Sequence, residues 1–183
     1  TTEESESFYI QYTGDHMLGS IPVNLRAGIR YEETDVVSQA LVPTYSSVVV
    51  SCVDGSGNPV LAGCNEFSAI PSGDQAFTNI TGNYDFVLPN LDLKFEFTEN
   101  LVGRASYSET ITRPSYTDIQ GGVTINTLIR VSGGNASGGN PNLQPLESKN
   151  IDLSLEYYTG DADYMSIGYF TKDISNFIGR GRL

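Results

Sequence analysis

The stretch that decides the fold is residues 88–107, which read LPNLDLKFEFTENLVGRASY. From residue 90 to residue 97 polar and apolar side chains alternate without interruption, and the alternation resumes after a polar turn at residues 98–100. A period of two is typical of a β-strand with one wet face and one dry face. The sequence therefore predicts two long antiparallel strands joined by a tight turn, which is a β-hairpin.

Two further hairpins follow the same plan on either side of this one. They are predicted at residues 4–12 with 22–31, across a turn at 13–21, and at residues 149–158 with 164–177, across a turn at 159–163. Their strands are about ten residues long or longer, which is the length that a membrane-spanning β-strand needs. All three hairpins therefore have long strands and short turns at the same end.

Long connections separate the hairpins at the other end, at about residues 32–83 and 113–145. We expect both to be largely irregular, with a short strand at residues 45–51, and connections of this length are usually functional or disordered. Glycine pairs at 121–122, 133–134 and 138–139 indicate flexible loop backbone. The motif GxxxxGK[ST] does not occur in the sequence, so we do not expect nucleotide binding.

Composition excludes several classes of function. The 183 residues include 22 acidic and 10 basic side chains, a formal charge of -12, which argues against a nucleic-acid partner. No run reaches the roughly 18 apolar residues of a transmembrane helix. A membrane-spanning β-strand would not produce such a run, because its apolar residues alternate with polar ones. The acidic start TTEESES is not a signal peptide, so we expect either a mature chain or an internal piece.

The two cysteines, Cys52 and Cys64, bracket a polar stretch that contains Gly, Pro and Asn. We predict a disulfide that closes a small surface loop, and therefore an oxidising compartment, with two free thiols as the alternative. A metal site is not expected, because the single histidine, His16, is far away in sequence and is predicted to be a solvated loop residue. Asp161 and Asp163 lack the spacing of a calcium loop and are predicted to be turn residues.

Long strands, short turns at one end, long loops at the other and aromatic residues near strand ends are the plan of an outer-membrane β-barrel. A soluble all-β sandwich also alternates, but its strands are usually shorter and its loops more even. Asp92, Lys94 and Glu96 place three charges on one face of a single strand, which suits a wide lumen filled with water or a plug. We therefore predict an all-β fold, an antiparallel transmembrane β-barrel segment.

Several motifs resemble the barrel of TonB-dependent outer-membrane receptors in order and spacing. They are Leu88-Pro89-Asn90-Leu91, Arg104 with Thr112-Arg113-Pro114, Gly139-Asn140-Pro141 with Leu143 and Pro145, and Ser148-Asn150-Asp152-Leu153. The stretch PVNLRAGIRYEET resembles an earlier strand of such barrels. Barrels of this family have about 22 strands around a plugged lumen. Because about six long strands are visible, with no plug domain, TonB-box segment or terminal aromatic residue, we expect residues 1–183 to be an internal part of an incomplete barrel.

The resemblance implies TonB-energised import of a scarce solute, such as a siderophore, cobalamin or an oligosaccharide, across the bacterial outer membrane. The implied partners are outer-membrane lipid, the remainder of the barrel with its plug, the TonB complex acting through that plug, and a small-molecule solute. Neither an enzyme nor a cofactor is expected. A passive outer-membrane pore and a soluble all-β surface or adhesion module remain the alternatives.

Candidate binding residues come from the second long connection, on the side that the resemblance makes extracellular. Arg113, Tyr116 and Asp118 begin this connection and are predicted to contact the solute. Polar residues of the wet strand faces are expected only to hydrate the wall or to contact the plug. These residues are Arg26, Arg30, Lys94, Arg104 and Glu156.

Overall fold

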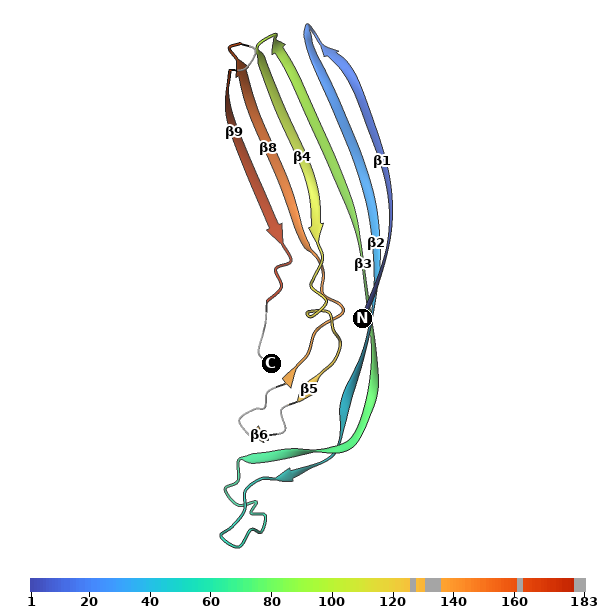
Figure 1. Cartoon of the computed structure of the whole chain (residues 1–183), viewed down its shortest axis with the longest axis vertical. Coiled ribbons are helices and arrows are strands. Elements are labelled where there is room, and N and C mark those ends of the chain that lie inside the picture. The colour runs from blue at the N-terminus through green and yellow to red at the C-terminus, as the bar shows by residue number, and fades with distance from the viewer. Residues whose placement is uncertain (126–127, 131–135, 161–162, 180–183) are drawn as a thin grey trace. The chain divides into compact units, whose positions relative to one another are not determined.

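The computed structural model describes residues 1–125, 128–130, 136–160 and 163–179, which form strands and loops (Figure 1). The long strands are β1 (Thr2–Leu18), β2 (Ile21–Val50), β3 (Glu66–Thr98), β4 (Leu101–Thr112), β8 (Leu146–Tyr158) and β9 (Tyr164–Ser175). They lie side by side in this order, and β6 (Leu128–Arg130) pairs with β3. Two short strands, β5 (Thr124–Ile125) and β7 (Ala136–Ser137), make a separate sheet. No helix in the described part is long and apolar enough to cross a membrane.

The register of the sheet collects the apolar residues on one face. Leu93 lies opposite Ala105, Ala105 opposite Leu153, and Leu153 opposite Tyr169. The next row runs through Lys94, Arg104, Ser154 and Gly168 and points to the other face. Because side chains alternate along a strand, a shift of one residue would exchange these two faces, so the hydrophobic pattern fixes the register.

The apolar face of this sheet is not covered by the described part of the chain. Leu153 is 47% exposed and Leu155 is 42% exposed, and large side chains of β9 on the same face, such as Ile167, are more exposed still. A second sheet packed on this face would bury these side chains, as it does in a sandwich. The predicted all-β antiparallel fold is confirmed, and the strand order ends at β1 and β9 without closing into a barrel.

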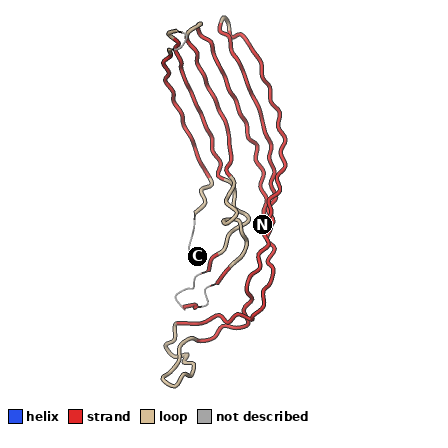
Figure 2. The backbone as a smooth tube through the Cα atoms, viewed as in Figure 1, coloured by secondary structure: helices blue, strands red, loops and turns tan. Residues whose placement is uncertain are grey.

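Two compact units make up the chain. The wall unit comprises Glu4–Asp35, Asn83–Pro114 and Gln144–Leu183, and it holds β4, β8 and β9. The loop unit comprises Thr1–Glu3, Val36–Gly82 and Ser115–Leu143. In the loop unit the segment after β4 is mostly irregular, whereas the segments from β2 and β3 are mostly strand (Figure 2).

The strands extend further than the sequence analysis predicts. Residues 32–44 and 66–83 were expected to be irregular but belong to β2 and β3, and the short strand expected at residues 45–51 is the end of β2. The loop between β2 and β3 therefore shrinks to residues 51–65. The predicted turn at residues 13–21 also shrinks to Gly19 and Ser20, because β1 continues to Leu18. The alternation persists in β2, where Thr34 and Ser38 are fully buried between exposed neighbours. The buried positions there hold Thr34 and Ser38 as well as Val36 and Ala40, so hydropathy does not separate the buried face from the exposed one.

Candidate functional site

A polar groove lies on the side of the wall unit opposite the apolar rows. Its cavity volume is about 590 Å³. The polar lining residues come from β2, β3, β4 and β8; they are Asn24, Arg26, Asp92, Lys94, Arg104, Ser106, Asp152 and Ser154. The remaining lining residues are Leu93, Ala105, Leu153, Gly168, Tyr169 and Phe170. A concave surface that carries both charge signs, amides and hydroxyls can bind a polar solute or another polar segment of protein.

Ion pairs connect most of the charged wall residues that the sequence analysis singled out. Lys94 Nζ lies 2.6 Å from Glu96 Oε1, and Arg104 Nε lies 3.0 Å from Glu156 Oε1. Pairs this exposed contribute little to stability, but they neutralise charge along the wall. That these residues only hydrate the wall or contact a plug stays a prediction.

The buried carboxylate of Glu32 organises the end of the wall unit where β4 stops. Its side chain is only 6% exposed, forms an ion pair with Arg30 at 2.7 Å, and accepts a hydrogen bond from Arg113. Arg113 also donates to Ser5 Oγ at 2.7 Å. A buried carboxylate is costly unless it is paired and hydrogen-bonded. The predicted solute-binding residue Arg113 therefore has a structural role as a partner of Glu32.

The other two predicted binding residues lie in one tight turn of the loop unit. The Asp118 N–H donates to the Ser115 carbonyl oxygen at 2.9 Å, and Ser115 Oγ donates to Asp118 Oδ2 at 2.7 Å. Tyr116 stands on this turn with 62% of its surface exposed. The turn thus presents one aromatic ring beside a carboxylate, whereas Arg113 belongs to the wall unit. Solute contact by Arg113, Tyr116 and Asp118 stays a prediction.

The glycine pairs at 121–122 and 138–139 allow close approach of other atoms, which differs from the flexibility that was predicted for them. The Gly139 N–H donates to the Gln120 carbonyl oxygen at 3.0 Å, and the Asn140 N–H donates to the Asp118 carbonyl oxygen at 2.7 Å. A Cβ atom on Gly139 would lie 2.6 Å from both carbonyl oxygens. Any larger residue would push these backbone segments apart. Residues 133–134 lie outside the described residues.

Asn150, from another motif of the resemblance, has a structural role in the wall unit. It is a buried residue whose Nδ2 donates to the Ser108 carbonyl oxygen at 3.2 Å and to the Ser148 carbonyl oxygen at 3.3 Å. Its Oδ1 accepts a hydrogen bond from Ser148 Oγ at 2.9 Å. The amide group therefore links β8 to β4, and burial without these partners would be costly.

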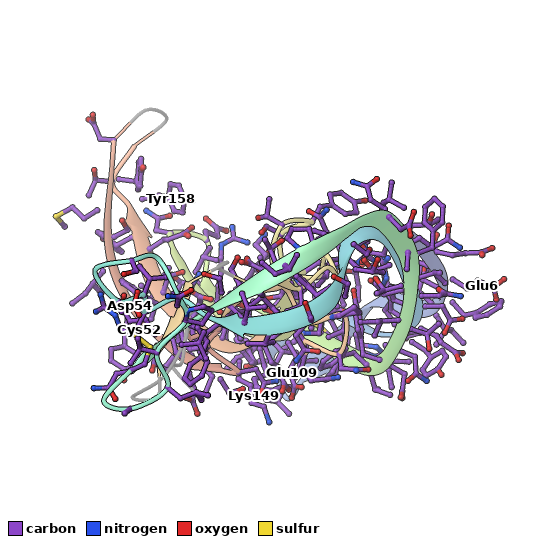
Figure 3. All side chains as sticks on the ribbon, turned by 90° about the horizontal axis from the view of Figure 1, so that it is seen from below. Glu6, Cys52, Asp54, Glu109, Lys149 and Tyr158 are labelled. Atoms are coloured by element: carbon purple, nitrogen blue, oxygen red, sulfur yellow. A yellow bond between two sulfur atoms is a disulfide. The ribbon has the colours of Figure 1, made fainter. Side chains whose placement is uncertain are left out.

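The predicted disulfide between Cys52 and Cys64 is confirmed, and it closes the loop between β2 and β3 (Figure 3). Inside this loop the Asp54 carboxylate accepts hydrogen bonds from the backbone N–H groups of Asn58, at 2.9 Å, and Ser56, at 2.8 Å. These donors stabilise the charged form and lower the pKa of Asp54, with the Asn58 backbone as the largest cause. Among the described residues, no group of three His, Cys, Asp or Glu side chains could hold a metal ion.

A charged row marks the end of the apolar face, and the sequence analysis did not identify it. Glu109 lies opposite Lys149, and Lys149 lies opposite Asp173, two residues along each strand from the last apolar row. Glu109 also accepts a hydrogen bond from the Tyr107 hydroxyl. Figure 3 shows Glu109 and Lys149 on the same side of the sheet. The sequence could have predicted this row, because Glu109 is two residues after Tyr107 and therefore lies on the same face of the strand.

Comparison with known proteins identifies similar chains. The family model described as the TonB dependent receptor-like β-barrel matches residues 2–183. A solved structure of a double mutant of the Serratia marcescens hemophore receptor HasR, in complex with its hemophore HasA and heme, is similar in fold, with a TM-score of 0.56 and 17% sequence identity. The likeness covers 96% of this chain and 26% of that chain, so this chain spans about a quarter of the receptor's length. No curated protein matches the sequence.

Proposed function

Because the chain belongs to the TonB-dependent receptor-like β-barrel family, we propose that it is part of the wall of an outer-membrane receptor that imports a scarce solute by TonB-energised transport. The chain would contribute lipid-facing and lumen-facing surface, together with part of the extracellular binding surface. The energy would reach the solute through a plug in the remainder of the receptor. No catalysis is part of this function.

The observation that carries the proposal is the uncovered apolar face with its charged boundary. Ile151, Leu153, Leu155 and Tyr157 of β8 are all exposed on one face, and β9 extends that face with Met165, Ile167 and Tyr169. A contiguous exposed apolar surface of this kind is rare on soluble monomers. In an outer-membrane barrel it contacts lipid, and polar residues begin where the hydrocarbon region ends. The charged row through Lys149 fits that position.

The opposite face supports a wet lumen. The groove beside Arg104 and Asp152 includes charged and polar side chains from four strands, and two of its charged residues, Lys94 and Arg104, are in ion pairs along the wall. A two-sheet sandwich would need that face or the apolar face as its core. These features favour an outer-membrane barrel over the soluble adhesion module, and family membership favours a receptor over a passive pore.

Four classes of solute are proposed. A siderophore, cobalamin or an oligosaccharide follows from the resemblance, and heme joins them because the similar receptor HasR was solved with a hemophore and heme. The exposed ring of Tyr116, with Asp118 beside it, is the proposed contact surface in the loop unit, and Arg113 is the proposed contact in the wall unit.

Uptake by the full-length receptor in the outer membrane of a host cell tests the function. The probes are heme, ferrichrome, cobalamin and maltohexaose, each offered with and without a functional TonB complex. We expect accumulation of one probe that stops when TonB is removed. Accumulation that persists without TonB would identify a passive pore, and a monodisperse monomer in water without detergent would identify a soluble module.

A further inference from the structure

We propose that Ser38 and Thr78 are positioning residues that hold the segment after β4 in place, so that Tyr116 and Asp118 meet the solute in a preorganised geometry. This inference rests on the proposed function and deepens it. It makes the binding segment a fixed part of the extracellular surface, in contrast to a lid that closes over bound solute.

The first observation is that both backbone polar groups of Gly121 form hydrogen bonds to side chains of other strands. Its N–H donates to Ser38 Oγ at 2.7 Å, and its carbonyl oxygen accepts a hydrogen bond from Thr78 Oγ1 at 3.1 Å. Ser38 belongs to β2 and Thr78 to β3, so two strands hold one residue, through the peptide groups on its two sides. The Thr78 hydroxyl also lies 3.2 Å from the Ala40 carbonyl oxygen, which ties the two strands at the same point.

Burial makes this attachment strong. Ser38 is fully buried, and its Oγ lies 3.0 Å from Thr1 Oγ1 as well as from the Gly121 nitrogen at 2.7 Å. A buried hydroxyl that loses its partners bears the full desolvation cost, so the attached arrangement is strongly favoured over a detached one. Ile119, two residues before Gly121, is 2% exposed and anchors the same segment through its apolar side chain.

Close contacts leave no room for an alternative residue at the attachment point. A Cβ atom on Gly121 would lie 3.0 Å from Ile80 Cδ1, and one on Gly122 would lie 2.9 Å from Ala40 Cβ. The segment therefore touches the strands through its bare backbone. The fit is tightest at Gly122, where a Cβ could be added only if the neighbouring strand shifted, and a tight fit is the property expected of a fixed contact.

The attachment extends by backbone hydrogen bonds to the turn that carries Tyr116. Gln120, next to Gly121, accepts a hydrogen bond from Gly139, and Asp118 accepts one from Asn140 at 2.7 Å. The Ile119 N–H in turn donates to the Ser115 carbonyl oxygen at 3.2 Å. Ordering this turn before the solute arrives removes an entropy cost from binding, which is how preorganisation raises affinity.

The experiment uses the full-length receptor in cells, with the variants Ser38→Ala and Thr78→Val. The matched controls are Gln39→Ala and Asn79→Ala, which change exposed neighbours on the same two strands. The readouts are the half-saturation concentration and maximal rate of uptake, measured with whichever of heme, ferrichrome, cobalamin and maltohexaose the wild type imports. Hydrogen exchange of the Gly121 amide reports the attachment itself.

We expect each of the two variants to raise the half-saturation concentration of uptake about two- to tenfold, which corresponds to the loss of one hydrogen bond. The maximal rate of uptake and the amount of receptor at the cell surface should stay unchanged. The Gly121 amide should exchange faster in Ser38→Ala, and both controls should match the wild type. A merely structural defect would instead reduce the surface amount and therefore the maximal rate.

A second pair of variants keeps the test decisive if Ser38→Ala is poorly assembled. Gly122→Ala adds a Cβ that collides with Ala40, and the double change Ala40→Gly with Gly122→Ala restores the space. We expect weaker apparent affinity in the single variant and recovery in the double variant. The inference is wrong if the Gly121 amide exchanges faster while the half-saturation concentration stays at the wild-type value. If the wild type imports none of the four probes in a TonB-dependent way, the proposed function fails, and this inference fails with it.

Discussion

Replacing Leu153 by arginine tests which face of the sheet contacts lipid. Leu153 lies in the middle of the apolar rows, with Ala105 and Tyr169 opposite it and Ile151 and Leu155 on either side along β8. Almost half of its surface is exposed, so the guanidinium would project into the bilayer core. An arginine near the bilayer midplane of a barrel costs about 2–4 kcal/mol of folding free energy. We expect Leu153→Arg to destabilise the folded receptor by that amount.

The matched control is Ser154→Arg, one residue further along the same strand and on the opposite face. The neighbouring position in β9 is Gly168, where an added Cβ would have only the Leu153 carbonyl oxygen nearby, at 3.7 Å. The neighbouring position in β4 is Arg104, whose charge is paired with Glu156 at 3.0 Å, so the repulsion between the two arginines is small. A charge on the polar face stays in water and does not enter the hydrocarbon of the bilayer. We therefore expect Ser154→Arg to lower the free energy of unfolding by less than about 1 kcal/mol, as is usual for surface substitutions and exposed charges.

Guanidinium titration of the full-length receptor in lipid vesicles measures both free energies of unfolding, provided that the slope of the titration is the same in both variants. The assignment of faces would be refuted if Ser154→Arg cost as much as Leu153→Arg or more. Equal stability of both variants with the wild type would equally refute a lipid-facing band at Leu153.

Three further predictions concern single contacts. Because backbone donors lower the pKa of Asp54 below its ordinary value of 3.8, the stability that its carboxylate gives the disulfide loop should be fully present above that value and lost as pH falls through the depressed pKa, which amide exchange of Ser56 and Asn58 can follow. Gly139→Ala should loosen the segment after β4 and increase its proteolysis, whereas Gly55→Ala, with open space around it, should not. Arg113→Ala should cost about 1–3 kcal/mol of unfolding free energy, because it removes a hydrogen-bond partner of the buried Glu32 carboxylate; a loss below about 1 kcal/mol would show that Arg113 has no structural role.

The faces of the strands could be predicted from the sequence because period-two alternation depends only on neighbouring residues. Leu91, Leu93 and Phe95 fall on one face and Asp92 and Lys94 on the other in any register that keeps the chain extended. The hairpins followed from the same local pattern together with the polar turns. The prediction failed where the buried positions of β2 hold small polar residues such as Ser38, because hydropathy carries no signal there.

The candidate site was predictable only in part. Tyr116 was singled out by its place at the start of a long connection, and the structure presents its ring on an ordered turn. The glycine pair at 121–122 was interpreted as flexible, because a glycine that permits close packing looks the same in sequence as one that permits bending.

The sequence by itself determined that the chain forms long amphipathic hairpins with one apolar and one polar face, because the alternation depends only on the order of consecutive residues. Only the tertiary structure decided which distant side chains meet. Arg113 pairs with Glu32, 81 residues earlier, and Gly121 is held by Ser38, 83 residues earlier. Such pairings depend on how strands far apart in the chain are aligned, and a local pattern holds no information about that alignment.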